Sequence, residues 1–166
     1  GKGNFGKVYI AQQPDGSYVA IKIVEGSKSI VQEARIQKAL SDIPYLMPAI
    51  DIWKEVKEGK TVLYQVMPLA GLGNIQVMNL TKLDNNFKEQ VLIYLTRQML
   101  EGLSQMHARG YFHGDFKSEN VVLDKEANLK IIDFGLSESC KRLYDVTRNK
   151  ETYTGHISPE RYLGIK

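Results

Sequence analysis

Two polar segments in the second half of the sequence set acidic residues beside apolar runs. In the first, Asp115 is followed by Lys117 and then by Asn120; in the second, Asp133 follows an Ile-Ile pair and precedes Phe-Gly. Magnesium takes oxygen ligands from one or two carboxylates together with substrate phosphates, so Asp133 and Asn120 are candidate metal ligands. Asp115 is a candidate acceptor for a hydroxyl proton, and Lys117 could balance charge on a transferring phosphoryl group. The alternative is that both segments are polar turns that cap a hairpin.

A glycine-rich segment begins the sequence. Residues 1–8 read G-K-G-N-F-G-K-V. Glycine lets a backbone approach phosphate oxygens closely and expose its N–H groups to them. A dinucleotide-binding fold requires a strand before such glycines and a helix that begins at them. Here the β-prone residues 8–11 follow instead, which disfavours a dinucleotide-binding oxidoreductase and favours a β-hairpin that covers phosphates. A glycine turn with a purely structural role is the alternative.

A lysine stands inside an apolar strand pattern. Lys22 shares one strand face with Ala20 and Val24. Glu33 is the one carboxylate in the helix expected over residues 29–40. An ion pair between Lys22 and Glu33 would hold the ammonium beneath phosphates and fix the helix on the sheet. The alternatives are a lysine at the sheet edge with its ammonium in water, and a glutamate on the solvated face of the helix.

The elements that must position these residues follow from periodicity and turn residues. Strands are expected at 8–11, 18–24, 49–56, 61–67, 120–123 and 129–132, and helices at 29–40 and 87–109. Ser29 with Gln32 predicts a capping box, and Gly110 predicts a left-handed helix cap. Residues 68–74 have no regular pattern and are the best boundary candidate, whereas the polar residues 136–158 are expected to form a long loop. The order predicts an α+β fold with two lobes.

The composition is that of an ordinary globular protein. The chain has 166 residues, of which 43% are hydrophobic and 25% charged, and its net charge is +3. These values argue against disorder, and the charge is too small to indicate nucleic-acid binding. The sequence has no apolar run long enough for a membrane span. The single cysteine, Cys140, cannot form an internal disulfide, so we expect an intracellular protein, cytoplasmic or nuclear.

The order of these segments resembles the signature of the eukaryotic protein kinases: the glycine turn, the strand lysine, the helical acid and then the two acidic loops. The resemblance extends from Gly1 to Tyr162. It implies a bilobal fold, with an antiparallel sheet and one helix in the N-lobe and a partial, mainly helical C-lobe. The implied parts are the N-lobe at 1–67, a hinge at 68–74, the C-lobe at 75–166 and, within it, an activation segment at 133–160 that Ser158-Pro159-Glu160 closes. Because the sequence starts within a motif, we expect a fragment of the catalytic domain, inactive in isolation.

The resemblance also implies the activity and its catalytic residues. It implies transfer of the γ-phosphate of ATP, with Mg2+ or Mn2+, to a protein substrate, and it gives no indication of oligomeric state. Lys22, paired with Glu33, is implied to bind the α- and β-phosphates, Asp115 to be the catalytic base and Lys117 its phosphate-contacting partner. The implied metal ligands are Asn120 and Asp133. Lysine two residues after the base favours serine/threonine specificity; tyrosine or dual specificity, and a pseudokinase that binds ATP or serves as a scaffold, are the alternatives.

A larger set of residues is implied to surround ATP. It comprises Gly1, Lys2, Gly3, Asn4, Phe5, Gly6, Val8, Ala20, Lys22, Met67, Pro68, Leu69, Ala70, Val122 and Ile132. The resemblance makes Met67 the gatekeeper, and Val8 and Ala20 the residues that enclose the adenine, with Val122 as its floor. It makes residues 68–70 the hinge whose backbone meets the adenine edge.

Three positions depart from the family pattern. Gly114 stands where an arginine usually meets a phosphorylated activation segment, so we expect weak dependence on that phosphorylation. Gln37 stands where an apolar residue is usual, and a polar group there costs about 1–3 kcal/mol unless it is hydrogen-bonded. Tyr153 stands where threonine is usual. We expect His113 to pack and hydrogen-bond so that it holds the catalytic loop. Apolar side chains of the helix at 87–109 are expected to be exposed.

Overall fold

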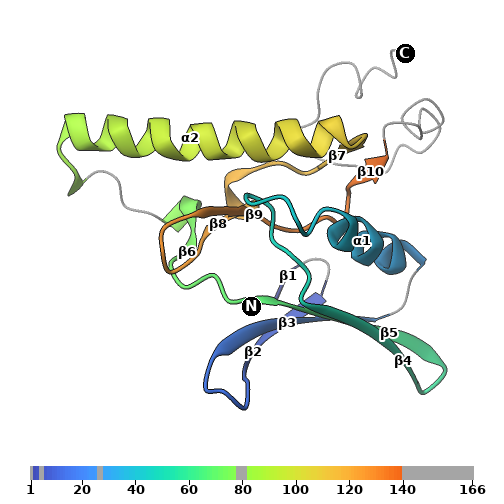
Figure 1. The fold of residues 1–166 in the computed structure, drawn as a ribbon. Coiled ribbons are helices and arrows are strands. Elements are labelled where there is room, and N and C mark those ends of the chain that lie inside the picture. Colours follow the sequence, from blue (N-terminus) through green and yellow to red (C-terminus); the bar gives the residue numbers. More distant parts are fainter. Residues whose placement is uncertain (1, 4–5, 26–27, 78–81, 140–166) are drawn as a thin grey trace.

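A five-stranded antiparallel sheet forms the N-terminal part of the fold (Figure 1). The computed structural model describes residues 2–3, 6–25, 28–77 and 82–139. The strand order is β1-β2-β3-β5-β4, with β1 at Lys2–Gly3, β2 at Gly6–Gln12, β3 at Tyr18–Glu25, β4 at Asp51–Lys57 and β5 at Lys60–Pro68. β4 and β5 are joined at Glu58 and Gly59, which both have positive φ, between the two predicted strands. This sheet supplies the scaffold that holds Lys22.

Helix α1 (Lys28–Ala39) packs on the inner face of this sheet. Alternate strand residues point to that face, and Val24, Leu63 and Ala34 form a small buried cluster between sheet and helix. The helix begins one residue before the predicted capping box, so Ser29 lies within the first turn and does not precede it. The pattern therefore located the helix correctly and its first residue incorrectly.

Helix α2 (Asn85–Ala108) is the long element of the C-terminal part. Asp84 caps its start by accepting a hydrogen bond from the Phe87 backbone N–H at 2.9 Å. Gly110 follows its end with φ at +76°, which confirms the predicted left-handed cap. No helix in the described part of the chain is long and apolar enough to cross a membrane.

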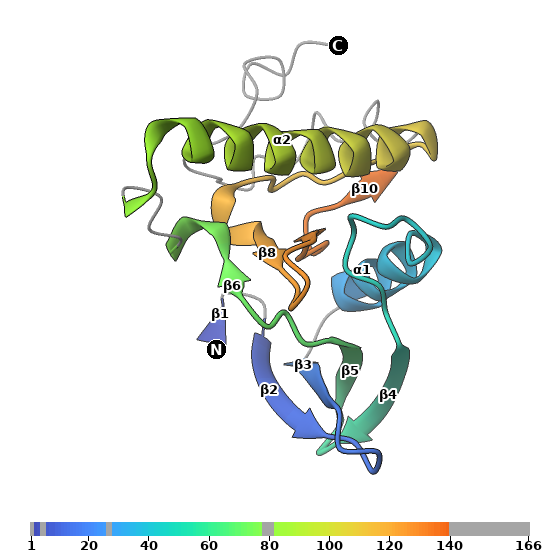
Figure 2. The same cartoon turned by 60° about the vertical axis from the view of Figure 1, so that its left-hand side comes forward.

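Short strands lie between α2 and the five-stranded sheet (Figure 2). One small sheet has the order β6-β8-β9, with β6 at Gly73–Asn74, β8 at Val121–Leu123 and β9 at Leu129–Ile131. A second pairs β7 (Tyr111–Phe112) with β10 (Glu138–Ser139). Single 3-10 turns occupy Ile75–Val77 and Ser118–Asn120. These short elements place the two predicted acidic loops beside each other.

The main core joins α1 to the C-terminal part. The segment that follows α1 contributes fully buried side chains, and its Leu46 forms a parallel bridge with Ile131 of β9. Met47 N–H donates to the Ile131 carbonyl, and Ile131 N–H donates to the Tyr45 carbonyl, each at 2.9 Å. The buried members of this core are Ile36, Leu40, Ile43, Leu46, Leu95, Met106, Val121, Leu123, Leu129, Ile131 and Phe134. The placement of α1 therefore depends on the C-terminal part as well as on the sheet.

Two predicted irregular segments contain short strands. Within the predicted linker 68–74, Pro68 still belongs to β5, and Gly73–Asn74 pairs with β8. Within the predicted loop 136–158, Glu138–Ser139 pairs with β7, and residues 140–158 lie outside the described residues. Strands of two residues are set by distant partners, so the local pattern gave no indication of them.

The outer side of α2 carries exposed apolar side chains, as predicted. They are Phe87, Leu92, Ile93, Tyr94 and Leu100. Phe87 and Leu92 are 50% and 46% exposed, whereas Leu95 and Met106 on the same helix are buried. Only the part of the helix that lies over the short strands buries its apolar face.

Candidate active site

A buried ion pair joins the sheet to α1. Lys22 Nζ lies 2.5 Å from Glu33 Oε1, and the two residues are 8% and 5% exposed. This confirms the predicted pair and excludes both alternatives, the edge lysine and the solvated glutamate. Removing an ion from water is costly unless a partner compensates it, so each charge makes the burial of the other tolerable.

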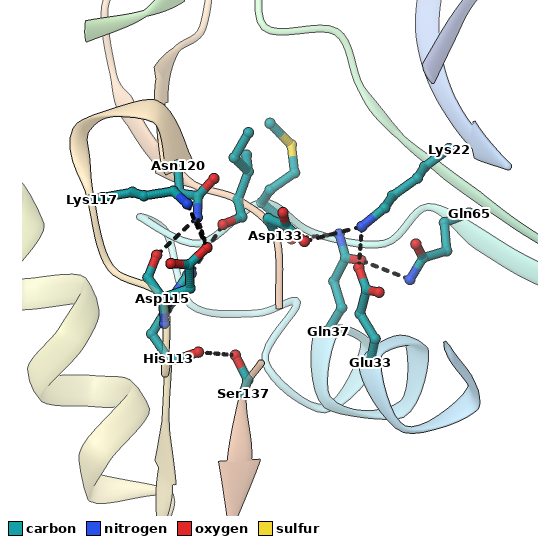
Figure 3. A network of polar contacts seen from close by, with 12 residues as sticks. Lys22, Glu33, Gln37, Gln65, His113, Asp115, Lys117, Asn120, Asp133 and Ser137 are labelled. Atoms are coloured by element: carbon teal, nitrogen blue, oxygen red, sulfur yellow. Dashed lines mark hydrogen bonds and ion pairs between the residues drawn. The ribbon is translucent and has the colours of Figure 1, made fainter. Parts of the chain in front are cut away.

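Asp133 brings the C-terminal part to the same lysine. Its Oδ1 lies 3.1 Å from Lys22 Nζ, so Lys22 bridges a carboxylate of α1 and one that follows β9 (Figure 3). Asp133 itself has φ at +65°, a left-handed conformation in which few non-glycine residues are found. Burial alone would lower the pKa of Lys22, but the charges of Glu33 and Asp133 outweigh it and raise that pKa. The ammonium therefore stays charged over the whole ordinary pH range.

Asp115 and its neighbours form a second polar cluster. Lys117 Nζ lies 2.9 Å from Asp115 Oδ2. The amide nitrogen of Asn120 donates to the backbone carbonyl of Asp115 at 2.8 Å and to its Oδ2 at 3.0 Å. Because the amide nitrogen is held on Asp115, the amide oxygen of Asn120 faces the other way, as a metal ligand must. Asp115 and Asn120 are buried, which fixes their side chains.

His113 holds this loop in place, as predicted. A carbonyl only accepts, so the 3.0 Å contact with the Ile132 carbonyl makes Nε2 the donor, and Nδ1 accepts from the Asp115 N–H at 3.3 Å. Burial lowers the pKa of His113, in agreement with a neutral ring. The ring also contacts Phe134 and Phe116. His113 thus links the Asp115 loop to the residue before Asp133.

Gly114 occupies a position that no other residue fits without a change in the backbone. Its φ is +80°, and a Cβ added there would lie 2.1 Å from the Leu136 carbonyl oxygen. The next residue after Leu136, Ser137, donates through Oγ to the His113 carbonyl at 2.9 Å. Where the family pattern has an arginine, the Asp115 loop therefore lies directly against the segment after Asp133.

The residues implied to surround ATP line the inner face of the sheet and its junction with the short strands. In the strand register, Ala20 lies opposite Met67, and Val8 lies opposite Lys22. Pro68 ends β5, with Leu69 and Ala70 directly after it. The remaining described members are Lys2 and Gly3 in β1, Gly6 in β2, Val122 in β8 and Ile132 directly after β9, whereas Gly1, Asn4 and Phe5 lie outside the described residues.

The polar groups fit a nucleotide phosphate with a divalent cation. Asp133 and Asn120 offer hard oxygen donors, and Lys22 offers a buried cation beside them. No group of three or more His, Cys, Asp or Glu side chains among the described residues is placed to hold a metal ion. A cation at this position would therefore complete its coordination with phosphate oxygens and water, as Mg2+ commonly does.

Two buried side chains of this region escaped prediction. Gln65 lies in β5 opposite Lys22, and Ser137 contacts His113 as described above. A polar residue at an inward position of an apolar strand was a signal for Gln65, since Leu63 and Met67 flank it at a spacing of two. The sequence carried no comparable signal for Ser137.

Comparison with known proteins agrees with this geometry. Residues 1–163 match the family model described as protein kinase domain. CBL-interacting protein kinase 17 of Oryza sativa subsp. japonica is 33% identical over 141 residues, which covers 82% of this chain and 31% of that protein. CBL-interacting serine/threonine-protein kinase 18 of Arabidopsis thaliana is 34% identical over 151 residues, with 86% and 28% covered.

A yeast protein extends the comparison. Serine/threonine-protein kinase BCK1/SLK1/SSP31 of Saccharomyces cerevisiae is 32% identical over 155 residues, which covers 87% of this chain and 10% of that protein. The chain spans less than a third of the length of these three relatives. With the family model matched over nearly all of its residues, the chain belongs to the protein kinase domain family.

Proposed function

We propose that the full-length protein is an active kinase that transfers the γ-phosphate of ATP to serine or threonine hydroxyls of a protein substrate. The observation that carries the proposal is the bridge made by Lys22, which contacts Glu33 and Asp133 at once. That bridge brings the phosphate-binding cation, the carboxylate that orients it and a metal-ligating carboxylate into one arrangement. In-line phosphoryl transfer requires positioning and electrostatics more than covalent chemistry.

Each polar side chain has a role in this proposal. Lys22 contacts the α- and β-phosphates, and Asp133 with Asn120 holds a divalent cation, for which we propose Mg2+. The cation, when bound, neutralises charge on the phosphates. The oxygen of the substrate hydroxyl forms a bond to the γ-phosphorus while the bond from that phosphorus to the β–γ bridging oxygen breaks. Asp115 accepts the proton that the hydroxyl loses. Lys117 offsets negative charge on the transferring group, and ADP leaves.

Two observations support serine/threonine specificity. Lys117 stands two residues after the base and makes an ion pair with it. The relatives from Saccharomyces cerevisiae and Arabidopsis thaliana carry serine/threonine-protein kinase in their names. We also propose an intracellular location, which follows from the need for ATP.

The alternative is a pseudokinase, which the departures at Gly114 and Gln37 favour. Neither departure removes a group that acts in the transfer. Incorporation of labelled phosphate into a peptide library by the full-length protein, followed by phosphoamino acid analysis, distinguishes the two. We expect phosphoserine and phosphothreonine, and a fall of about 100- to 10,000-fold in the Asp115→Asn variant, the usual contribution of a general base.

The exposed Asp51 of β4 provides a matched control. Asp51→Asn makes the same chemical change outside the site and should keep wild-type activity. ATP binding without phosphate incorporation by the wild type would establish a pseudokinase, and phosphotyrosine as the main product would overturn the specificity.

A further inference from the structure

A second contact between sheet and helix runs beside the Lys22–Glu33 pair. Gln65 lies directly opposite Lys22 in the register of β3 and β5, and Gln37 follows Glu33 by one turn of α1. The side chain of Gln65 donates from Nε2 to Gln37 Oε1 at 3.2 Å (Figure 3). The two pairs are therefore consecutive links between the same strands and the same helix.

Gln37 connects this link to the C-terminal part. Its Nε2 donates to the Met47 carbonyl at 3.1 Å. The N–H of Met47 donates in turn to the carbonyl of Ile131, the last residue of β9, at 2.9 Å. Asp133 follows two residues later. A continuous series of hydrogen bonds thus runs from the sheet through α1 to the strand that positions Asp133.

The buried contact between Gln37 and Gln65 leaves one polar atom without a partner in the described part of the chain. Gln37 and Gln65 are 3% and 1% exposed, and Gln65 Oε1 has no hydrogen-bond partner among the described residues. A buried polar atom without a partner destabilises the fold, so the contact between the two glutamines carries a cost that an apolar contact at the same place would not have. What the glutamines add is direction, because a hydrogen bond fixes the rotation and height of a helix more narrowly than apolar contact does.

We propose that Gln37 and Gln65 are positioning residues, whose hydrogen bond holds α1 where Glu33 reaches Lys22. The proposal rests on the proposed kinase function, since it assigns the pair a purpose in assembling that site. Loss of this hydrogen bond should therefore misplace Glu33 while the stability of the fold stays near that of the wild type.

The test is the double variant Gln37→Leu/Gln65→Leu of the full-length protein. We expect its unfolding temperature to stay near that of the wild type, because the variant removes the unpaired Gln65 oxygen while the Met47 carbonyl loses its donor. We expect kcat to fall by about 10- to 100-fold and KM for ATP to rise, since a misplacement of about 1 Å in a catalytic arrangement can cost about 100-fold. Backbone amides of α1 should exchange with deuterium faster than in the wild type.

Gln98 of α2 provides the matched control. It is also a buried glutamine, and its Oε1 accepts from the Leu129 N–H at 2.7 Å, in the main core. Gln98→Leu should lower the unfolding temperature and leave kcat per folded molecule unchanged. In the double variant kcat falls and the unfolding temperature is kept, whereas in Gln98→Leu the unfolding temperature falls and kcat is kept. A purely structural role for Gln37 and Gln65 would not produce this difference.

Two outcomes overturn the proposal. One is a double variant whose kcat, KM and α1 exchange match the wild type. The other is a double variant that behaves like Gln98→Leu, with stability lost and kcat retained. If the wild type itself transfers no phosphate, the proposed function fails, and exchange of the α1 amides together with the unfolding temperature still decides whether the glutamines position the helix.

Discussion

The two polar clusters of the site are assembled over very different distances along the chain. The loop cluster, Asp115 with Lys117 and Asn120, is made within six consecutive residues. The lysine cluster, Lys22 with Glu33 and Asp133, joins residues that are 11 and 111 positions apart. The loop cluster therefore persists whenever its own loop is intact, whereas the lysine cluster exists only while sheet, helix and C-terminal part are correctly placed.

This difference indicates where the activity of such a site can be controlled. Contacts within one loop respond little to shifts of distant elements, whereas contacts between elements respond to any shift of α1. The glutamine link lies beside the lysine cluster, where placement is the weak point. The loop cluster is instead connected by His113 to the residue before Asp133 and by Gly114 to Leu136, which follows Asp133.

Substitution of Lys22 should have the largest effect on activity and stability, because both ion pairs of the lysine cluster are lost with it. Lys22→Met leaves Glu33 buried with no cation beside it, a change that typically costs about 3–5 kcal/mol of unfolding free energy. Activity should fall by at least about 1,000-fold, since the phosphates also lose their protein cation. Steady-state kinetics and urea unfolding measure the two effects. Lys60→Met, at an exposed lysine of β5, should change neither.

Gly114→Ala should break the loop cluster by a steric route. The added Cβ would meet the Leu136 carbonyl oxygen at 2.1 Å, so the backbone must move, and the loss of unfolding free energy should exceed the roughly 1–2 kcal/mol that positive φ alone costs. Urea unfolding and kcat should both show the loss.

Gly59→Ala isolates the steric part of that loss. Gly59 has nearly the same φ, +75°, and its added Cβ would have nothing within 4 Å. Its substitution should cost only the conformational penalty of positive φ, about 1–2 kcal/mol. Equal losses for the two variants would contradict the contact between the Asp115 loop and Leu136.

The sequence predicted the loop cluster and the Lys22–Glu33 pair because each leaves a local signal. Asp115 and Asn120 stand at a short fixed spacing, and Glu33 is the one carboxylate in its helix. It could not predict the contact of Gln37 with Gln65, which depends on the register of β5 against β3 and on the rotation of α1. Nor could it predict β6 and β10, which have two residues each and no periodicity of their own.

Lowering the pH should weaken the loop cluster through His113. Burial lowers the pKa of this histidine below its usual 6.5, so the unfolded chain binds a proton more readily than the folded one. The stability that the neutral ring contributes is complete above that usual value and is lost progressively as the pH falls below it.

The measurement is the unfolding temperature between pH 7.5 and pH 5 for the wild type and for His113→Asn. The wild type should lose stability more steeply, since the variant has no ring to protonate. Parallel profiles would mean that the neutral state of His113 does not contribute to holding the loop.

The exposed ion pair between Arg109 and Asp42 should matter least, although it joins the end of α2 to the segment after α1. The two terminal guanidinium nitrogens of Arg109 each contact the Asp42 carboxylate at 2.5 Å, but the Asp42 and Arg109 side chains are 67% and 40% exposed. Water screens such pairs, and Arg109 also donates to the Ala39 carbonyl, a bond that Asp42→Asn would leave in place. We therefore expect that variant to show the unfolding temperature, kcat and KM of the wild type. A clear fall in kcat would mean that α1 is held from its C-terminal end, and that the lysine cluster depends on a contact at the surface as well as on the buried glutamines.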